Sequence, residues 1–126
     1  SAFIAYCFAE KKGFSKFSSY TANGNADGAF IYTGFRPAFI LLKDTGTNAW
    51  YLMDSKRDGY NAENKGLIPS QNSIEQAGSY GVDFLSNGFK CRTNDGWTNQ
   101  TGLTYLYAAF AEFPLVSSND IPTVAR

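Results

Sequence analysis

Residues 82–93 read Val-Asp-Phe-Leu-Ser-Asn-Gly-Phe-Lys-Cys-Arg-Thr. Apolar and polar side chains alternate on both sides of Asn87 and Gly88, as they do in strands that turn one face toward a core. The Asn-Gly pair readily supplies the positive φ angles of a type I′ turn. The stretch therefore predicts a tight hairpin, with residues 82–86 and 89–93 as its two strands.

Strand signals of the same kind recur in both directions along the chain, separated by turns rich in Gly, Asn and Asp. Residues 14–21, 29–33, 38–43, 49–54 and 103–111 are predicted as strands. Residues 55–79 are irregular, so we expect a long loop there with room for one short strand. These strands predict an all-β fold in which neighbouring strands run antiparallel.

Two segments, residues 3–9 and 38–43, are apolar on both alternating faces. Such a pattern is typical of a central strand that is covered on each side. We therefore expect residues 3–9 to lie deep in the fold. Trp50 lies within another apolar strand and is predicted to belong to the core.

The length and composition fit one antiparallel β-sandwich domain. The chain has 126 residues, of which 17% are aromatic, and it contains 12 glycines. Aromatic residues favour strands, and glycines favour the turns between them. We expect residues 1–113 to form the domain and residues 114–126, which include two prolines, to form a tail over the surface or toward a neighbouring chain.

Charge and residue usage argue against several classes of function. Eleven basic residues balance 11 acidic ones, which predicts no long-range attraction to nucleic acid or to an anionic membrane surface. The chain contains no His, so catalysis by Ser-His or Cys-His pairs and His-based metal sites are excluded. A glycoside hydrolase needs only two carboxylates. The available acids are Glu10, Asp54, Asp58, Asp83 and Glu112. We expect them to have turn, rim or ion-pair roles, and we do not expect an enzyme.

Cys7 and Cys91 both fall in the middle of predicted strands. Thiols in such positions commonly act as small buried hydrophobic groups. We expect two structural thiols, although a disulfide is an alternative if their strands are neighbours.

The loop at residues 94–99 has the side chains of a sugar-binding site. Trp97 offers an aromatic face for a pyranose ring, and Asn94, Asp95 and Asn99 offer groups that bond hydroxyls. The alternative is that Trp97 folds back onto the sheet, and this alternative is favoured because loop tryptophans commonly pack locally.

The turn at residues 23–28 has oxygen donors suited to calcium. Asp27, Asn23 and Asn25 are the candidate ligands, together with backbone carbonyl groups. One carboxylate supplies little charge, so a plain turn is the favoured alternative.

Residues 4–10 and 106–112 match each other in pattern at an offset of 102 residues. They are expected either to be two equivalent central strands of one sandwich, or to show that the first belongs to a preceding copy in a tandem array. The abrupt start on an apolar strand slightly favours the tandem array.

Four phrases carry a resemblance to a known family: residues 4–17, 32–42, 83–90 and 105–112. Together they resemble a concanavalin-like domain that recurs in the tail and fibre proteins of tailed bacteriophages. The resemblance implies a lectin-like jelly-roll sandwich and a place in the virion, next to other virion proteins. It also implies recognition of host cell-surface carbohydrate and a homo-oligomer, with a trimer favoured because fibres are commonly trimeric. The alternatives are a purely architectural tail or capsid-decoration domain and, more distantly, a glycoside hydrolase.

Overall fold

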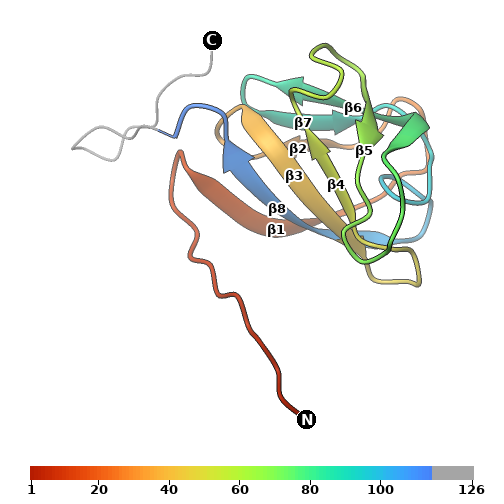
Figure 1. Cartoon of the computed structure of the whole chain (residues 1–126). Coiled ribbons are helices and arrows are strands. Elements are labelled where there is room, and N and C mark those ends of the chain that lie inside the picture. The colour runs from red at the N-terminus through yellow and green to blue at the C-terminus, as the bar shows by residue number, and fades with distance from the viewer. Residues whose placement is uncertain (115–126) are drawn as a thin grey trace.

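The computed structural model describes residues 1–114, apart from the side chain of Ser79. Eight strands of this part form two four-stranded sheets packed face to face (Figure 1). Sheet 1 has the order β1 (Ser15–Thr21), β8 (Thr104–Ala111), β3 (Pro37–Asp44) and β4 (Tyr51–Asp54). Sheet 2 has the order β2 (Phe30–Tyr32), β7 (Gly88–Cys91), β6 (Gln76–Leu85) and β5 (Glu63–Gly66).

All strand pairs within the two sheets are antiparallel. The predicted antiparallel β-sandwich is therefore confirmed, whereas its jelly-roll and concanavalin-like topology stays a prediction. The long irregular stretch contains β5, as expected, and its end forms the start of β6. The predicted C-terminal tail lies outside the described residues from residue 115 onward.

The core lies between the two sheets, because every second side chain of a strand points to the same face. Sheet 1 contributes nine buried apolar side chains to it: Tyr20, Ile40, Leu42, Tyr51, Met53, Tyr105, Tyr107, Ala109 and Ala111. Sheet 2 contributes five: Ile31, Val82, Phe84, Phe89 and Cys91. At one edge, the backbone amides of Leu52 and Leu67 each donate to the other's carbonyl oxygen, at 2.9 and 2.8 Å. This pair ties β4 of sheet 1 to the segment that follows β5 of sheet 2.

The hairpin between β6 and β7 is confirmed, but its turn lies one residue earlier than predicted. Leu85 pairs with Gly88, so Ser86 and Asn87 are the two loop residues. Gly88 is the first residue of β7, and its φ angle is not in the positive range. A Cβ on Gly88 would overlap the carbonyl oxygen of Ile31 in β2. Glycine is needed here for close approach of a neighbouring strand and not for the turn.

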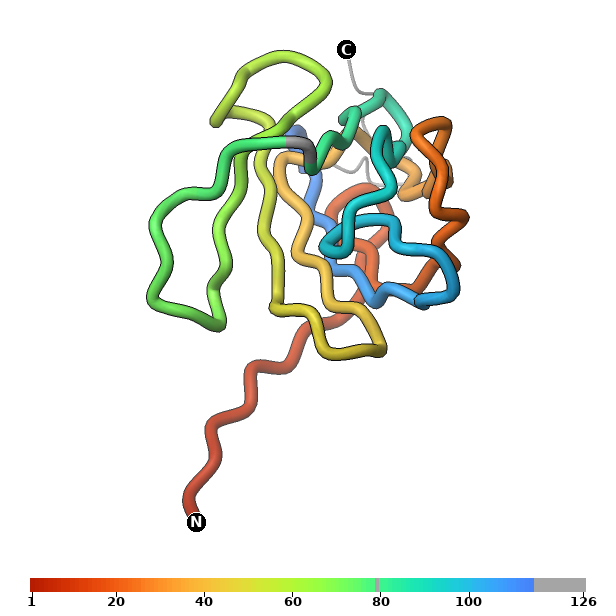
Figure 2. Tube along the Cα trace, turned by 90° about the vertical axis from the view of Figure 1, so that its right-hand side faces the viewer, coloured from red at the N-terminus to blue at the C-terminus, as the bar shows by residue number. Residues whose placement is uncertain are grey.

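Residues 3–9 do not form the predicted central strand. The N-terminal segment (residues 1–9) belongs to neither sheet, and both views show it leaving the sandwich (Figures 1 and 2). Phe3, Ile4 and Tyr6 are 91%, 83% and 82% exposed. The interpretation of residues 4–10 and 106–112 as two central strands of one sandwich is therefore wrong. Most of the second segment is β8, which pairs with β1 and β3.

Two further predictions about burial need correction. Trp50 is 44% exposed, because Tyr51 points into the core and its neighbour must point the other way. Both cysteines are free; Cys91 is buried and Cys7 is exposed. The structural-thiol prediction therefore holds for Cys91 and is wrong for Cys7.

Candidate binding surface

The outer face of sheet 1 is predominantly apolar. Residues that pair directly in an antiparallel sheet share a face. One such row runs across all four strands through Phe17, Ala108, Leu41 and Leu52. We define the outer face by this row and by three further side chains that the pairing places beside it: Phe39, Leu106 and Phe110.

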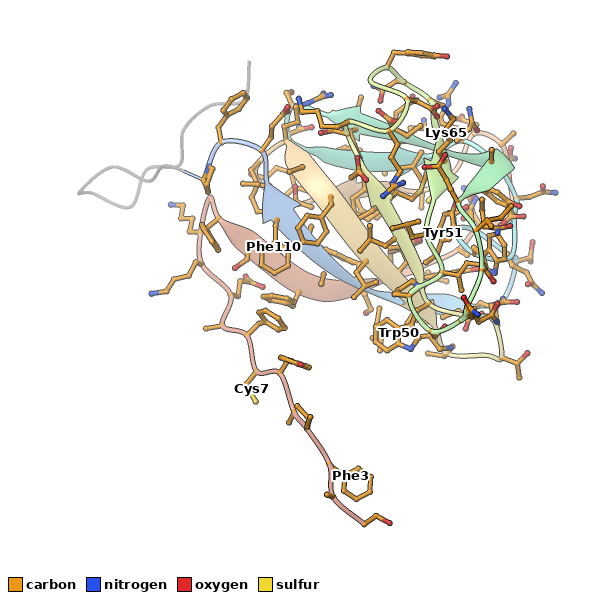
Figure 3. All side chains as sticks on the ribbon, viewed as in Figure 1. Phe3, Cys7, Trp50, Tyr51, Lys65 and Phe110 are labelled. Carbon is orange, nitrogen blue, oxygen red and sulfur yellow. The ribbon has the colours of Figure 1, made fainter. Side chains whose placement is uncertain are left out.

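A phenylalanine cluster covers one end of the outer face (Figure 3). The ring of Phe110 lies 4.9 Å from that of Phe39, 5.7 Å from that of Phe17 and 6.3 Å from that of Phe14, measured between centroids. Phe8 of the N-terminal segment lies 5.9 Å from both Phe17 and Phe110. Stacked and edge-to-face rings at these separations attract one another beyond the burial of area. The cluster therefore holds the base of the N-terminal segment against the sheet.

A shallow groove lies beside Trp50. Leu41, Trp50, Pro69 and Ser70 line it, and its volume is about 280 Å³. The hydroxyl oxygen of Ser70 accepts the backbone N–H of Trp50 at 3.3 Å, which fixes the loop after β5 against the strand. Sequence reasoning missed this site because the run around Trp50 is apolar on both faces. The available signal was that Trp50 and Tyr51 are neighbours in a strand-like run, so that only one of the two can point into the core.

The predicted sugar-binding loop packs against the domain. The ring of Trp97 stacks on that of Tyr51 at 5.0 Å and lies 4.7 Å from that of Tyr80. The Asp95 carboxylate accepts the backbone N–H of Trp97 at 2.8 Å and so closes the turn. Asn94 is exposed. The Trp97 ring that was predicted to stack on a sugar is thus partly buried against two tyrosine rings.

Asn99 joins the two predicted sites through hydrogen bonds. Its side chain is fully buried, and its Nδ2 lies 2.9 Å from Asn23 Oδ1 and from the carbonyl oxygens of Asn25 and Thr93. Its Oδ1 accepts the backbone N–H of Asn23 at 3.1 Å. A buried amide with every group bonded serves structure, because its groups are not accessible to a ligand. Asn99 therefore holds the turn at residues 23–28 against the loop at residues 94–99.

The oxygen donors of the predicted calcium site have protein partners. Asp27 Oδ1 lies 2.6 Å from the ammonium group of Lys90, and this hydrogen bond lowers the pKa of Asp27. Asn25 Oδ1 accepts the backbone N–H of Asp27 at 2.9 Å. Within residues 1–114, no group of three or more His, Cys, Asp or Glu side chains is arranged to hold a metal ion.

The acidic residues considered for catalysis form ion pairs. Glu112 accepts from Arg36 at 2.8 Å and from Lys56 at 2.9 Å, and the hydrogen bond from Lys56 lowers its pKa most. The remaining pairs are Glu10 with Lys16, Asp54 with Arg57, Asp58 with Lys65 and Asp83 with Arg92. These contacts are the ion-pair and turn roles expected from the sequence.

Glu63 was not anticipated from the sequence. Its side chain is only 1% exposed, and burial raises its pKa. Its carboxylate accepts the backbone N–H of Asp58 at 3.1 Å, while the Asp58 carboxylate accepts the N–H of Asn64 at 2.7 Å. The two acids close the loop at residues 58–64 from both ends, which is a structural arrangement.

These features define an antiparallel β-sandwich with an apolar outer face. No helix among residues 1–114 has the length and apolarity of a membrane span. The chain belongs to the family described as "Domain of unknown function (DUF7483)", which matches residues 1–114 and so includes the N-terminal segment. Searches of curated proteins and of solved structures find no match.

Proposed function

We propose that this chain is a non-enzymatic structural module of a bacteriophage tail or fibre that assembles with its neighbours through the outer face of sheet 1. The observation that carries the assembly role is the apolar character of that face, which runs from the phenylalanine cluster to Trp50. Contiguous exposed apolar patches on soluble proteins mark interaction surfaces. The place in the virion is supported by the resemblance of residues 4–17, 32–42, 83–90 and 105–112 to phage tail domains.

The distribution of charge supports the same role. Eleven positive and 11 negative charges cancel, so an approaching copy meets no net repulsion. On the outer face, Leu106 is 53% exposed and Trp50 is 44% exposed. Lys43 lies directly opposite Leu106, but its ammonium group bonds the Asp44 carboxylate and the carbonyl oxygen of Gly46 at the end of β3, and Asp54 lies on the edge strand β4. A defined homo-oligomer would cover Leu106 and Trp50, and we expect a trimer.

Light scattering after size-exclusion chromatography tests the proposal on the whole chain. We expect a defined oligomer whose mass falls toward that of one chain when Leu106 is replaced by Glu, because a charge would then be buried in the interface. Ile74→Glu is the matched control, since Ile74 is 86% exposed and does not belong to the outer face of sheet 1. A single-chain mass for the unmodified protein at all concentrations would contradict the proposal.

The groove beside Trp50 favours a second function, binding of host cell-surface glycans. An exposed indole next to a hydroxyl, that of Ser70, has the elements that stack on and bond a sugar ring. Binding to a glycan array should be lost in Trp50→Ala and kept in Tyr60→Ala, whose side chain is 72% exposed elsewhere. Equal binding by the two variants would remove the groove from consideration.

A further inference from the structure

The N-terminal segment is apolar, uncharged and exposed. Residues 1–9 read Ser-Ala-Phe-Ile-Ala-Tyr-Cys-Phe-Ala, and only Phe8 is shown stacking on other rings of the domain. Figure 3 shows Phe3 and Cys7 well away from the sheets. Exposed apolar side chains in an extended segment are typical of a strand that pairs with another chain.

The chain directly after the segment starts a hairpin with β1, but the segment itself does not continue it. The backbone amide of Ser15 donates to the carbonyl of Lys11 at 2.9 Å, and the return bond measures 3.3 Å. If the hairpin continued, the next amide of β1 facing this way, that of Phe17, would bond the carbonyl of Ala9. It bonds the Glu10 carboxylate at 3.3 Å instead, while Ser15 Oγ donates to Ala9 at 3.1 Å. The side chains of Glu10 and Ser15 thus end the pairing.

Register explains why pairing within one chain stops there. Continuing the hairpin from Lys11 and Ser15 would put Phe8 opposite Ser18, on the inner face of the sheet. Phe8 instead stacks on Phe17 of the outer face. The hairpin register would place the Phe8 side chain on the inner face, whereas the phenylalanine cluster holds it on the outer face. A hairpin within one chain cannot satisfy both requirements.

The remaining edge of β1 is available for pairing. β1 is an edge strand, and the amide of Phe17 shows that odd-numbered residues direct their backbone groups away from β8. Ser19 and Thr21 share this orientation, and their side chains are exposed. An open edge of this kind is a template for an added strand.

The sequence of the segment matches that of the strand that already pairs with β1. Residues 4–10 repeat the pattern of residues 106–112, most of which form β8. β8 pairs with β1 along the full length of β1, from Ser15 to Thr21. The segment therefore resembles β8 in sequence, and β8 is a strand that pairs with β1.

We propose that residues 3–8 of one copy add as an antiparallel strand to the free edge of β1 in a second copy. This inference rests on the proposed function and names its partner as a second copy of the chain. In the register that continues the outer face, Tyr6 lies opposite Ser19, Ile4 opposite Thr21 and Cys7 opposite Ser18. The larger side chains Ile4, Tyr6 and Phe8 then extend the outer face, and the smaller Ala5 and Cys7 take the other face.

Disulfide trapping on the full chain tests the register. Directly opposite residues of two strands are close enough for a disulfide, and Cys7 is an exposed free thiol. After oxidation with diamide, we expect Ser18→Cys to give covalently linked chains that pair Cys7 with the new cysteine. Mixing isotopically labelled and unlabelled protein shows by mass spectrometry that the two thiols come from different copies. Asn87→Cys, in the exposed turn after β6, measures the background of random collisions.

Ser19→Cys detects the competing arrangement. A hairpin completed within one chain in the register of Lys11 and Ser15 would place Cys7 opposite Ser19. An intramolecular disulfide in that variant, with no linked chains from Ser18→Cys above the Asn87→Cys background, would overturn the inference.

Substitution of the segment tests the inference without cysteine chemistry. The double variant Ile4→Asn, Tyr6→Asn should weaken self-association by at least about tenfold, since it removes two apolar side chains from the interface. Ile74→Asn, Tyr60→Asn is the matched control, because it changes the same two residue types at similarly exposed positions outside the segment. Association that the segment variant leaves intact but Leu106→Glu abolishes would refute strand addition and leave the assembly role standing. No association in the unmodified chain would refute both.

Discussion

Gly88 at the start of β7 lies directly against the backbone of Ile31 in β2. The two strands pair with Ile31 opposite Phe89 and Tyr32 opposite Gly88, so this approach is part of sheet 2. A Cβ at position 88 would overlap the Ile31 carbonyl oxygen, and backbone atoms cannot rotate away as a side chain would. The edge strand β2 is thus held at a distance that only glycine permits.

We predict that Gly88→Ala destabilises the domain by about 1–3 kcal/mol, because β2 must shift to accommodate the methyl group. Urea denaturation monitored by tryptophan fluorescence measures the change. Gly59→Asn is the control, since a Cβ at position 59 meets no atom within 4 Å and Asn tolerates the positive φ of 79°. Equal stability of Gly88→Ala and the unmodified chain would show that β2 is not closely packed there.

Trp97→Ala should lower the free energy of unfolding by about 2 kcal/mol. The substitution removes the ring that stacks on Tyr51 and packs against Tyr80. Trp50→Ala should change stability by less than about 0.5 kcal/mol, because its side chain is exposed on the outer face. Thermal unfolding of the two variants side by side distinguishes a structural tryptophan from an exposed one, and the reverse order would contradict these placements.

Asn99→Ala should destabilise the chain by about 1–3 kcal/mol, because it leaves partly buried backbone groups of Asn23, Asn25 and Thr93 without their partner. Asn94→Ala, at an exposed position five residues earlier, should be nearly neutral.

Addition of EDTA to the unmodified chain should not change its melting temperature, since Lys90 already forms an ion pair with the Asp27 carboxylate. A fall in melting temperature with EDTA would instead support a calcium site at Asp27.

The two thiols should differ in reactivity. Burial raises the pKa of Cys91 to about 11, so almost none of the reactive thiolate forms at pH 8. Cys7 is exposed. We expect iodoacetamide to label one thiol per native chain, at Cys7, and two after unfolding in guanidinium chloride. Peptide mapping that finds label on Cys91 in the native protein would show that the core opens readily.

The stability of the fold should depend on pH through Glu112. The pKa of Glu112 is lower in the folded chain than in the unfolded chain, where it is near 4.5. The ionised carboxylate therefore stabilises the fold at pH values above 4.5, and this contribution is lost as the pH falls through the folded-state pKa. Glu112→Gln should therefore cost up to about 1 kcal/mol at pH 7 and less at pH 3. Denaturation curves at the two pH values measure the difference, and an equal cost at both would exclude the ion pairs with Arg36 and Lys56 as its source.

Local patterns predicted most of the strands correctly. β3, β7 and β8 lie in runs whose apolar residues alternate or continue. β6 was predicted only over its second half, because it begins at Gln76, within the stretch that was expected to be a loop. The ion-pair roles of the acidic residues and the packing of Trp97 against the sheet were also among the expectations. Asn99 was predicted to bind a ligand because the sequence shows that its side chain is polar. The sequence does not show that the turn at residues 23–28 already forms hydrogen bonds with that side chain.

The sequence by itself determined that the chain is an antiparallel β-sandwich, because alternation and turn residues act over a few neighbouring positions. Only the tertiary structure decided which apolar residues are covered. Residues 3–9 and 38–43 have the same apolar pattern, yet β3 lies between β8 and β4, whereas the N-terminal segment leaves the sandwich. Burial depends on strand pairing between residues far apart in the chain, such as β1 with β8. The local pattern shows which side chains are apolar, but it cannot identify the strand or loop that buries them.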